Sequence, residues 1–347
     1  MPASTPHVRS GKGLAQARPE RNAQLAEIQR ARLLAAAVRA VEELGYTGTT
    51  VAHITRRARV SRRTFYELFA NREECLLAVL EDLLSRLRAE LAAAQPEGST
   101  WRERVRTGLW TILAFFDREP QLARLCVVQA LRGGPAVLER REQVLAQLAA
   151  VVDEGRCESA RGAALTPLTA EGLVGAAFTI VHARLQRGES HQKSESRPLT
   201  ELQGELMGMI ALPYLGAAAA RREQTRRAPV PRVNDADTAA GVAQVASDPL
   251  SGVPMRLTYR TARVLECVAE LSGRGSNPSN RLVAKHAGIS DQGQVSKLLT
   301  RLERLGLLVN AGEKHLKGEP NAWRLTATGE QVTNNIKFGN PHERAAA

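Results

Sequence analysis

Apolar residues recur at helical spacing along most of the chain, and this pattern predicts a mostly α-helical protein. The first strongly periodic stretch indicates a helix over residues 28–44 that ends at Gly45. Two short helices follow, joined by a tight turn that contains Val60. Thr50 is a suitable N-cap for the first of them, whose apolar residues fall on one face. The start of the chain is therefore expected to fold as three helices.

The second short helix, residues 62–69, divides into an apolar and a polar face. Ser61 precedes it as an N-cap, and Phe65 and Leu68 lie on the apolar side. A helix-turn-helix that enters the major groove of DNA needs this division, because one face seats the helix and the other reaches the bases. We therefore predict a DNA-binding head whose outward side chains are Arg62, Arg63, Thr64 and Tyr66.

The stretch 30–80 also resembles the DNA-binding domain of TetR-type transcriptional regulators. The run from Ser61 to Glu74 is similar to the recognition helix of that family and to the start of the next helix. The family usually has lysine where Arg72 stands, and either cation at a helix N-terminus can hold a phosphate. An amphipathic hairpin with solvated arginines is the alternative. The resemblance implies phosphate contacts for Thr50, Tyr66 and Arg72, and positions near base edges for Ser61, Arg62, Arg63 and Thr64.

Helical patterns continue through the middle of the chain, at residues 73–95, 101–118, 120–131 and 136–154. The resemblance implies that this bundle encloses a pocket for a small effector. Apolar residues at helical spacing are equally typical of a plain core, so both interpretations stay open. The candidate lining residues are Trp110, Phe116, Cys126 and Phe178.

Two later helices carry small residues and a broad apolar stripe, at residues 173–185 and 199–219. Small residues let helices approach closely, and the stripe is broader than the contacts of one chain need. The resemblance implies that these helices pair with their twofold mates, so we expect a homodimer. An intramolecular core is the alternative, and Pro213 should kink the second helix. The candidate interface residues are Gly175, Phe178, His182, Met207 and Ile210.

A second compact region begins at Met255, after a stretch rich in polar residues and proline. Helices are expected at residues 258–272, 280–287 and 292–305, the last capped by Ser290, and strands at 307–310 and 322–325. With its Leu-Thr-x-x-Gly run after the second strand, this region resembles a MarR-like winged helix. The candidate DNA contacts are Ser290, Gln292, Gln294, Ser296, Lys297, Arg301, Lys314 and Lys317.

Charge is concentrated at the two ends of the chain. The net charge of +12 comes from 48 Lys and Arg against 36 Asp and Glu. Residues 1–75 hold 13 basic and 7 acidic side chains, residues 76–254 hold 21 of each, and residues 255–347 hold 14 and 8. Because phosphate neutralisation supplies most of the non-specific affinity for nucleic acid, two basic ends predict two DNA contacts.

Several classes of protein are disfavoured by what the sequence lacks. The four cysteines are scattered, without metal-ligand or disulfide spacing, which fits a reducing cytoplasm. No apolar run approaches the roughly 18 residues of a membrane span. Residues 76–220 contain no glycine-rich phosphate loop and no nucleophile elbow. We therefore expect no membrane contact, no enzyme activity, no metal and no cofactor.

The expected fold class is mostly α, with a TetR-like head and helical regulatory domain followed by a small α+β winged helix. The expected function is that of a cytoplasmic, homodimeric, ligand-responsive regulator, a repressor, whose partners are operator DNA and a small-molecule effector. The alternatives are a winged helix that binds protein, or a non-specific architectural DNA-binding protein. The expected segments are a basic disordered arm at 1–24, the head at 25–75, the effector and dimerisation domain at 76–220, a flexible linker at 221–254, the winged helix at 255–335 and a tail at 336–347.

Overall fold

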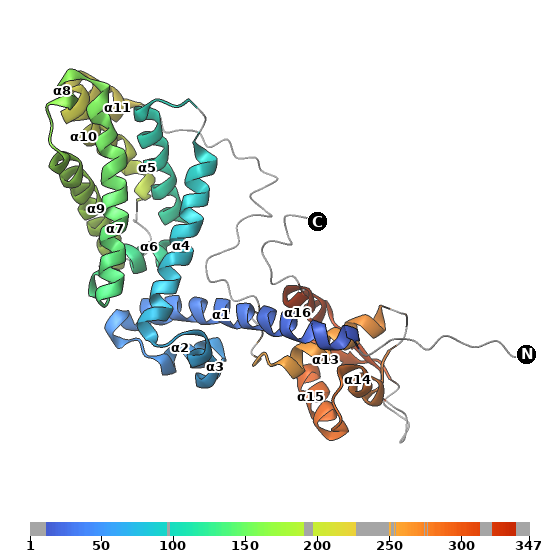
Figure 1. The fold of residues 1–347 in the computed structure, drawn as a ribbon. Helices are drawn as coiled ribbons and strands as arrows, with labels where there is room; N and C mark the ends of the chain where they lie inside the picture. Colours follow the sequence, from blue (N-terminus) through green and yellow to red (C-terminus); the bar gives the residue numbers. More distant parts are fainter. Residues whose placement is uncertain are drawn as a thin grey trace, which may run out of the picture. The chain divides into compact units, whose positions relative to one another are not determined.

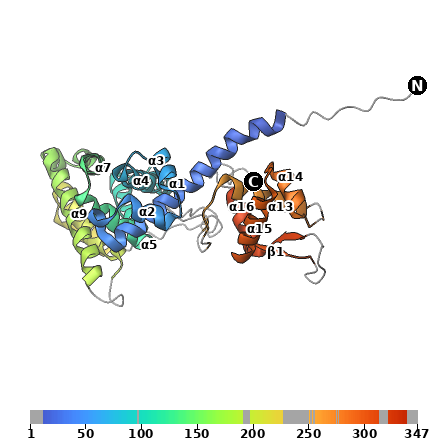
Figure 2. The same ribbon diagram turned by 90° about the horizontal axis from the view of Figure 1, so that it is seen from below.

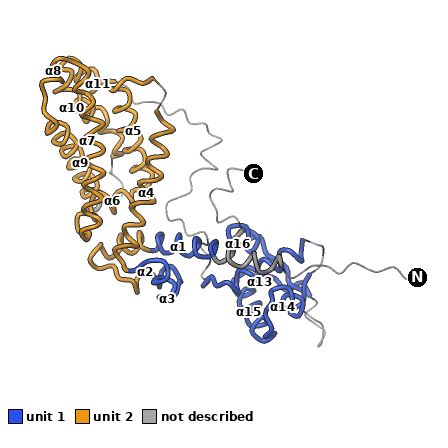
Figure 3. Tube along the Cα trace, viewed as in Figure 1, with its two compact units in different colours: residues 1–36, 54–70, 246–347 blue, residues 37–53, 71–245 orange. Residues whose placement is uncertain are grey.

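The fold is that of a computed structural model, which divides into two compact units (Figure 3). Unit 1 comprises residues 1–36, 54–70 and 246–347, and unit 2 comprises residues 37–53 and 71–245. The boundary between the two units runs through the predicted helix-turn-helix. The structure describes residues 12–95, 98–190, 197–226, 250, 253, 255–273, 275, 277–312 and 321–337.

The first three helices confirm the predicted helix-turn-helix elements. They are α1 (Lys12–Gly48), α2 (Val51–Ala58) and α3 (Arg62–Leu68) (Figure 1). Gly45 interrupts α1 with a φ of 71°, a left-handed conformation that glycine adopts without strain, so the regular helix ends where predicted. The start of α1 was predicted wrongly, because the helix begins at Lys12 and not at residue 28. Of the expected arm, residues 1–11 lie outside the described residues.

The rest of unit 2 is a bundle of helices. Side-chain caps fix several starts: the Asn71 side chain accepts from Glu74 N, and Thr100 and Glu103 form a reciprocal capping box. Figures 1 and 2 show the long helices packed side by side. The elements are α4 (Arg72–Ala94), α5 (Trp101–Arg118), α6 (Pro120–Val127), η1 (Gln129–Arg132), α7 (Pro135–Asp153), η2 (Glu154–Glu158), α8 (Ala160–Ala163), α9 (Pro167–Ser190), η3 (Leu199–Leu202), α10 (Gln203–Leu215) and α11 (Ala217–Thr225).

One core cluster of this bundle corrects two interface predictions. Trp101 and Tyr214 meet edge to face, with ring centroids 5.3 Å apart, and the Trp101 indole N–H donates to the Val151 carbonyl at 3.0 Å. Met207 and Ile210 belong to the same cluster and are only 1% and 5% exposed. They are already covered inside one chain, so the intramolecular alternative is correct for both.

The first residues of the expected linker are helical. Gly216, with a φ of 82°, ends α10, and α11 then runs from Ala217 to Thr225. Glu223 on this helix is 2% exposed and pairs with Arg106 at 2.9 Å. Residues up to Thr225 therefore belong to unit 2, and residues 227–249 lie outside the described residues.

The C-terminal region contains the predicted helices and strands in the predicted order, followed by one helix, α16, that was not predicted. They are α13 (Tyr259–Ser272), α14 (Asn280–Ala287), α15 (Gln292–Arg304), β1 (Leu308–Asn310), β2 (Trp323–Leu325) and α16 (Ala327–Lys337). The two strands pair antiparallel, with Leu308 opposite Leu325. Gly329 approaches the Leu307 carbonyl so closely that a Cβ there would clash, which explains the glycine of the Leu-Thr-x-x-Gly run.

The core of this region also includes the start of α1. Ile28 is 2% exposed in the same cluster as Val264, Leu299 and Trp323, and Leu25 packs against it. An asparagine network adds polar links: the Trp323 indole N–H donates to Asn280 Oδ1 at 2.5 Å. The C-terminal elements and the N-terminal half of α1 therefore fold as one body.

Candidate functional sites

Of the side chains predicted to point outward from α3, Arg62, Arg63 and Tyr66 are exposed, whereas Thr64 is half-buried with its Oγ1 2.8 Å from Ser61 Oγ. Tyr66 is 58% exposed and its ring stands edge-on to Phe65, which is fully buried. Arg62 is exposed, and Arg63 is exposed while its Nε donates to Glu67 Oε1 at 2.9 Å. The helix is fixed at its start, where Ser61 Oγ accepts from Thr64 N at 3.0 Å. The polar side chains therefore stand on a short helix held from beneath by an apolar anchor.

Two predicted phosphate contacts flank this helix in sequence. Thr50 is exposed, and its Oγ1 accepts from His53 N at 3.3 Å as a cap of α2. Arg72 is half-buried; its Nη1 donates to the carbonyls of Thr49 at 2.8 Å and Tyr46 at 3.3 Å. The guanidinium also lies over the Tyr46 ring, 5.1 Å from its centroid. Arg72 therefore ties the start of α4 to the end of α1, and its phosphate contact stays a prediction.

The predicted contacts on α15 have mixed outcomes. The cap prediction was wrong by one residue, because Asp291 and not Ser290 accepts from Gln294 N; this hydrogen bond lowers the pKa of the Asp291 carboxyl. Gln294 Oε1 accepts from Arg260 at 2.6 Å, and Ser296 Oγ accepts from Asn280 at 3.3 Å. Of the predicted contacts on this helix, Gln292, Gln294, Lys297 and Arg301 are exposed, while Lys314 and Lys317 lie outside the described residues.

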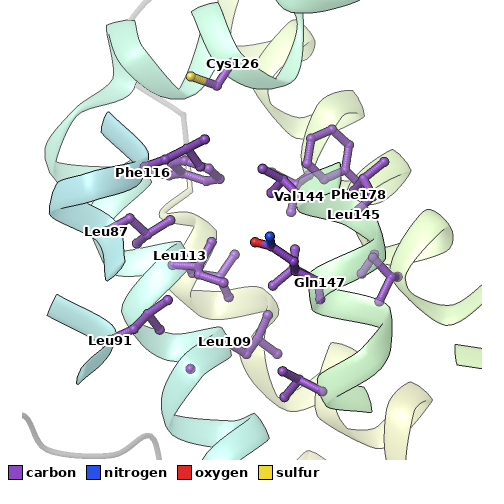
Figure 4. A pocket seen from close by; sticks show the side chains of 18 of the residues that line it. Leu87, Leu91, Leu109, Leu113, Phe116, Cys126, Val144, Leu145, Gln147 and Phe178 are labelled. Atoms are coloured by element: carbon purple, nitrogen blue, oxygen red, sulfur yellow. The ribbon is translucent and has the colours of Figure 1, made fainter. Parts of the chain in front are cut away.

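Unit 2 encloses an apolar cavity of about 290 Å³ between α4, α5, α6, α7, α9 and α10 (Figure 4). Three predicted lining residues, Phe116, Cys126 and Phe178, line it. Burial raises the pKa of the Cys126 thiol to about 12, so the thiol stays neutral at physiological pH. The prediction for Trp110 was wrong: its neighbour Leu109 lines the cavity and Trp110 does not. Successive residues of a helix point in directions about 100° apart, which separates the two.

Three charged side chains that line the cavity, all of them arginines, were missed by the sequence analysis. Arg141 on α7 lines it, with its guanidinium 4.9 Å from the centroid of the Phe178 ring. Arg141 Nε is buried and has no hydrogen-bond partner among the described residues. Two further arginines, Arg88 and Arg104, also line the cavity. The sequence signal that could have identified Arg141 was its position inside an apolar helical stripe. The cavity thus joins a large apolar surface to a small number of cationic groups.

The remaining interface predictions lie on α9. Gly175 is exposed, and a Cβ placed there would meet no described atom within 4 Å. Leu168 and Ile180 on the same helix are 70% and 37% exposed. Phe178 and His182 are half-buried. Within the described residues, part of α9 therefore presents small and apolar side chains that nothing covers.

Comparison with known proteins finds matches to the stretch that was predicted as the head. Residues 33–79 match the family of bacterial regulatory proteins described as the tetR family. The chain is 35% identical over 78 residues to the HTH-type transcriptional regulator BetI of Rhizobium meliloti (strain 1021), covering 22% of the chain and 38% of BetI. It is 31% identical over 97 residues to HbdR of Aromatoleum sp. (strain CIB), covering 28% of the chain and 42% of HbdR. The chain therefore spans only about two-fifths of these relatives.

Among solved structures, the chain is similar to the fatty acid degradation regulator FadR from Bacillus halodurans. The sequences are 18% identical, the TM-score is 0.46, and the similarity covers 52% of this chain and 94% of that one. No helix in the described part of the chain is both long enough and apolar enough to cross a membrane.

The exposed polar face of α3 and its capped, anchored geometry define a DNA-binding helix-turn-helix. The match over residues 33–79 covers most of this module, which is similar in this stretch to the tetR family of bacterial regulatory proteins.

Proposed function

We propose that the chain is a homodimeric transcriptional repressor that binds operator DNA through α3 and releases it when an effector fills the cavity of unit 2. The observation that carries this proposal is the solvent-facing row of Arg62, Arg63 and Tyr66 on a helix whose other face is buried. A helix of this kind reads base edges in the major groove. The C-terminal region, which carries the elements of a winged helix, is proposed as a second DNA-binding module.

The uncovered face of α9 supports the homodimer. Open space at Gly175 and the exposed side chains of Leu168 and Ile180 leave room for a second copy of the helix. A twofold dimer would present two α3 helices to two half-sites about 34–36 Å apart along DNA, or a multiple of that spacing.

The experiment that tests the proposed function is selection of binding sites from fragmented genomic DNA of the source organism, using the full chain. Enrichment of fragments that share a twofold-symmetric sequence is expected, because two α3 helices related by a dyad read inverted half-sites. Footprinting on an enriched fragment then gives the half-site spacing. Equal recovery of unrelated fragments would reject sequence-specific binding and favour the architectural alternative.

Filling the cavity is expected to abolish binding of an apolar, anionic probe. Gly108 on α5 lines the cavity, and a Cβ there would meet only Leu91 at 3.7 Å and Gln95 at 4.0 Å, both ordinary contacts. The substitution Gly108→Phe should therefore place a ring in the cavity. The measurement is the fluorescence of 1-anilinonaphthalene-8-sulfonate, whose rings suit the apolar wall and whose sulfonate suits Arg141. We expect at least about a tenfold loss of affinity, consistent with roughly 1.4 kcal/mol per factor of ten.

The matched control is Ala92→Phe, which adds the same ring at an exposed position of α4 outside the cavity. It should leave probe binding unchanged. Equal probe affinity in Gly108→Phe and the wild type, with both folded by circular dichroism, would reject the cavity as the effector site.

A further inference from the structure

Two adjoining surface hollows of unit 1 bring together arginines from distant parts of the sequence. The first is lined by Arg56 and Arg59, near the turn between α2 and α3, and by Arg256 and Arg301 of the C-terminal region. The second shares Arg256 and Arg301 and adds Arg260. Neither hollow is lined by a carboxylate. The result is a continuous cationic surface shared by the helix-turn-helix and the C-terminal domain.

The extended segment around Arg256 places its side chain on this surface. Its neighbours Met255 and Leu257 are 1% and 3% exposed, whereas Arg256 is exposed, an alternation typical of extended backbone. Two side chains of α1 hold the segment: Arg32 Nη1 donates to the Met255 carbonyl at 3.0 Å, and Gln29 Nε2 donates to the Leu257 carbonyl at 3.2 Å. Arg32 is itself 2% exposed, so this attachment is buried.

The other side of the first hollow is held by the turn of the helix-turn-helix. Arg59 has a φ of 52°, which is uncommon for a residue other than glycine, and Val60 N donates to the Thr55 carbonyl at 3.1 Å. Ser61, the cap of α3, lines the same hollow. The cationic surface therefore begins directly where the recognition helix begins.

Three arginines of this surface have no acidic partner among the residues that the structure describes. Among the described residues, no carboxylate lies within ion-pair distance of Arg56, Arg256 or Arg301. Like charges gathered in one place repel, and a bound anion removes that repulsion. Guanidinium groups match the geometry of phosphate through paired N–H donors. Since the arginines are exposed and spread over two adjoining hollows, they suit a polyanion lying across the surface better than a small enclosed anion.

We propose that Arg56, Arg256 and Arg301 hold backbone phosphates of the same DNA duplex that α3 reads, so that the C-terminal domain acts as a phosphate clamp beside the recognition helix. This inference rests on the proposed function, because it needs a duplex seated on α3. It assigns the C-terminal domain a positioning role, since backbone contacts fix register and carry no sequence information directly. It also places both DNA-binding modules of one chain on one DNA segment.

The test compares the full chain with the variant Arg256→Gln/Arg301→Gln on a genomic duplex enriched by the wild type. Binding is measured by fluorescence anisotropy at several salt concentrations. Each phosphate contact contributes about 0.9 to the slope of log affinity against log salt. The variant should therefore lower the slope by about 1 to 2 and the affinity by about tenfold or more. Arg56→Gln, on the other side of the hollow, should lower the slope by about 1 on the same grounds.

The matched control is Arg304→Gln, an exposed arginine of α15 that lines neither hollow, and it should leave the slope unchanged. If the wild type binds but the double variant and Arg56→Gln keep its slope and affinity, the clamp is rejected while the proposed function stands. If the wild type enriches no DNA, the proposed function itself fails. Titration of the wild type and the double variant with sodium tripolyphosphate tests whether the hollow instead binds a free anion. If the double variant loses tripolyphosphate binding but keeps its DNA binding, the hollow is a site for a free anion and the clamp is overturned.

Discussion

The double substitution Arg62→Ala/Arg63→Ala is expected to weaken binding of the selected operator at least about 100-fold, because each good bidentate contact to a base is worth roughly 1–3 kcal/mol. Both side chains stand on the solvent face of α3, with that of Arg63 87% exposed. The free energy of unfolding should change by less than about 0.5 kcal/mol, as for other surface substitutions. Fluorescence anisotropy at fixed salt measures the affinity, and urea denaturation measures the stability.

The control for this prediction removes the same charge elsewhere. Arg221 and Arg222 are adjacent, exposed arginines on α11, so Arg221→Ala/Arg222→Ala lowers the net charge by the same amount. This control should bind the operator with at most a few-fold loss from the weaker long-range field. Equal losses in the two variants would mean that net charge alone governs binding. Wild-type affinity in the α3 variant would show that α3 is not the recognition helix.

The head could be predicted closely from the sequence because its signals are local. Ser61 caps α3 through a residue three positions away, and Gly45 ends a helix through its own backbone conformation. The Thr100–Glu103 capping box likewise lies within four residues, and α5 begins where the pattern predicted. Such devices act within one turn of helix, so a single stretch of sequence contains all the information that they need.

Local signals become ambiguous where two neighbouring residues can both act as the N-cap of a helix. Ser290 and Asp291 are both good N-caps, and the structure uses Asp291, which accepts from Gln294 N at 3.0 Å. The chosen cap depends on where the helix packs against the rest of its domain. The sequence pattern does not contain this packing information, so it cannot decide between two adjacent N-cap candidates.

The pattern of apolar residues could not predict contacts between segments that are distant in the sequence. An apolar stripe shows that Met207 and Ile210 must be covered, but only the packed bundle shows that they share a core cluster with Trp101 and Tyr214. The same holds for Arg141, which helical periodicity places in an apolar stripe of α7 but which only the fold places over Phe178. Periodicity identifies which side of a helix is covered and not which helix covers it.

The substitution Glu223→Gln is expected to destabilise the protein by about 3–5 kcal/mol, because it leaves a buried arginine without its counter-charge. Arg106 Nη1 donates to Glu223 Oε2 at 2.9 Å, and the two side chains are 5% and 2% exposed. Arg226 also lies near the carboxylate, with 3.6 Å between its Nη1 and Glu223 Oε1. Thermal unfolding should show a fall in Tm on the order of 10 °C, at 2–4 °C per kcal/mol for a domain of this size.

A second variant separates loss of the pair from loss of one charge. In Arg106→Met/Glu223→Leu no charge is left buried, so much of the lost stability should return. Glu154→Gln is the matched control: it breaks the half-exposed pair of Glu154 with Arg104 and should cost less than about 1 kcal/mol, since solvent screens that pair. If Glu223→Gln costs no more than Glu154→Gln, α11 does not pack on α5 in solution. The chain that follows α11 would then be attached to unit 2 through α10 alone, so this variant also tests where unit 2 ends.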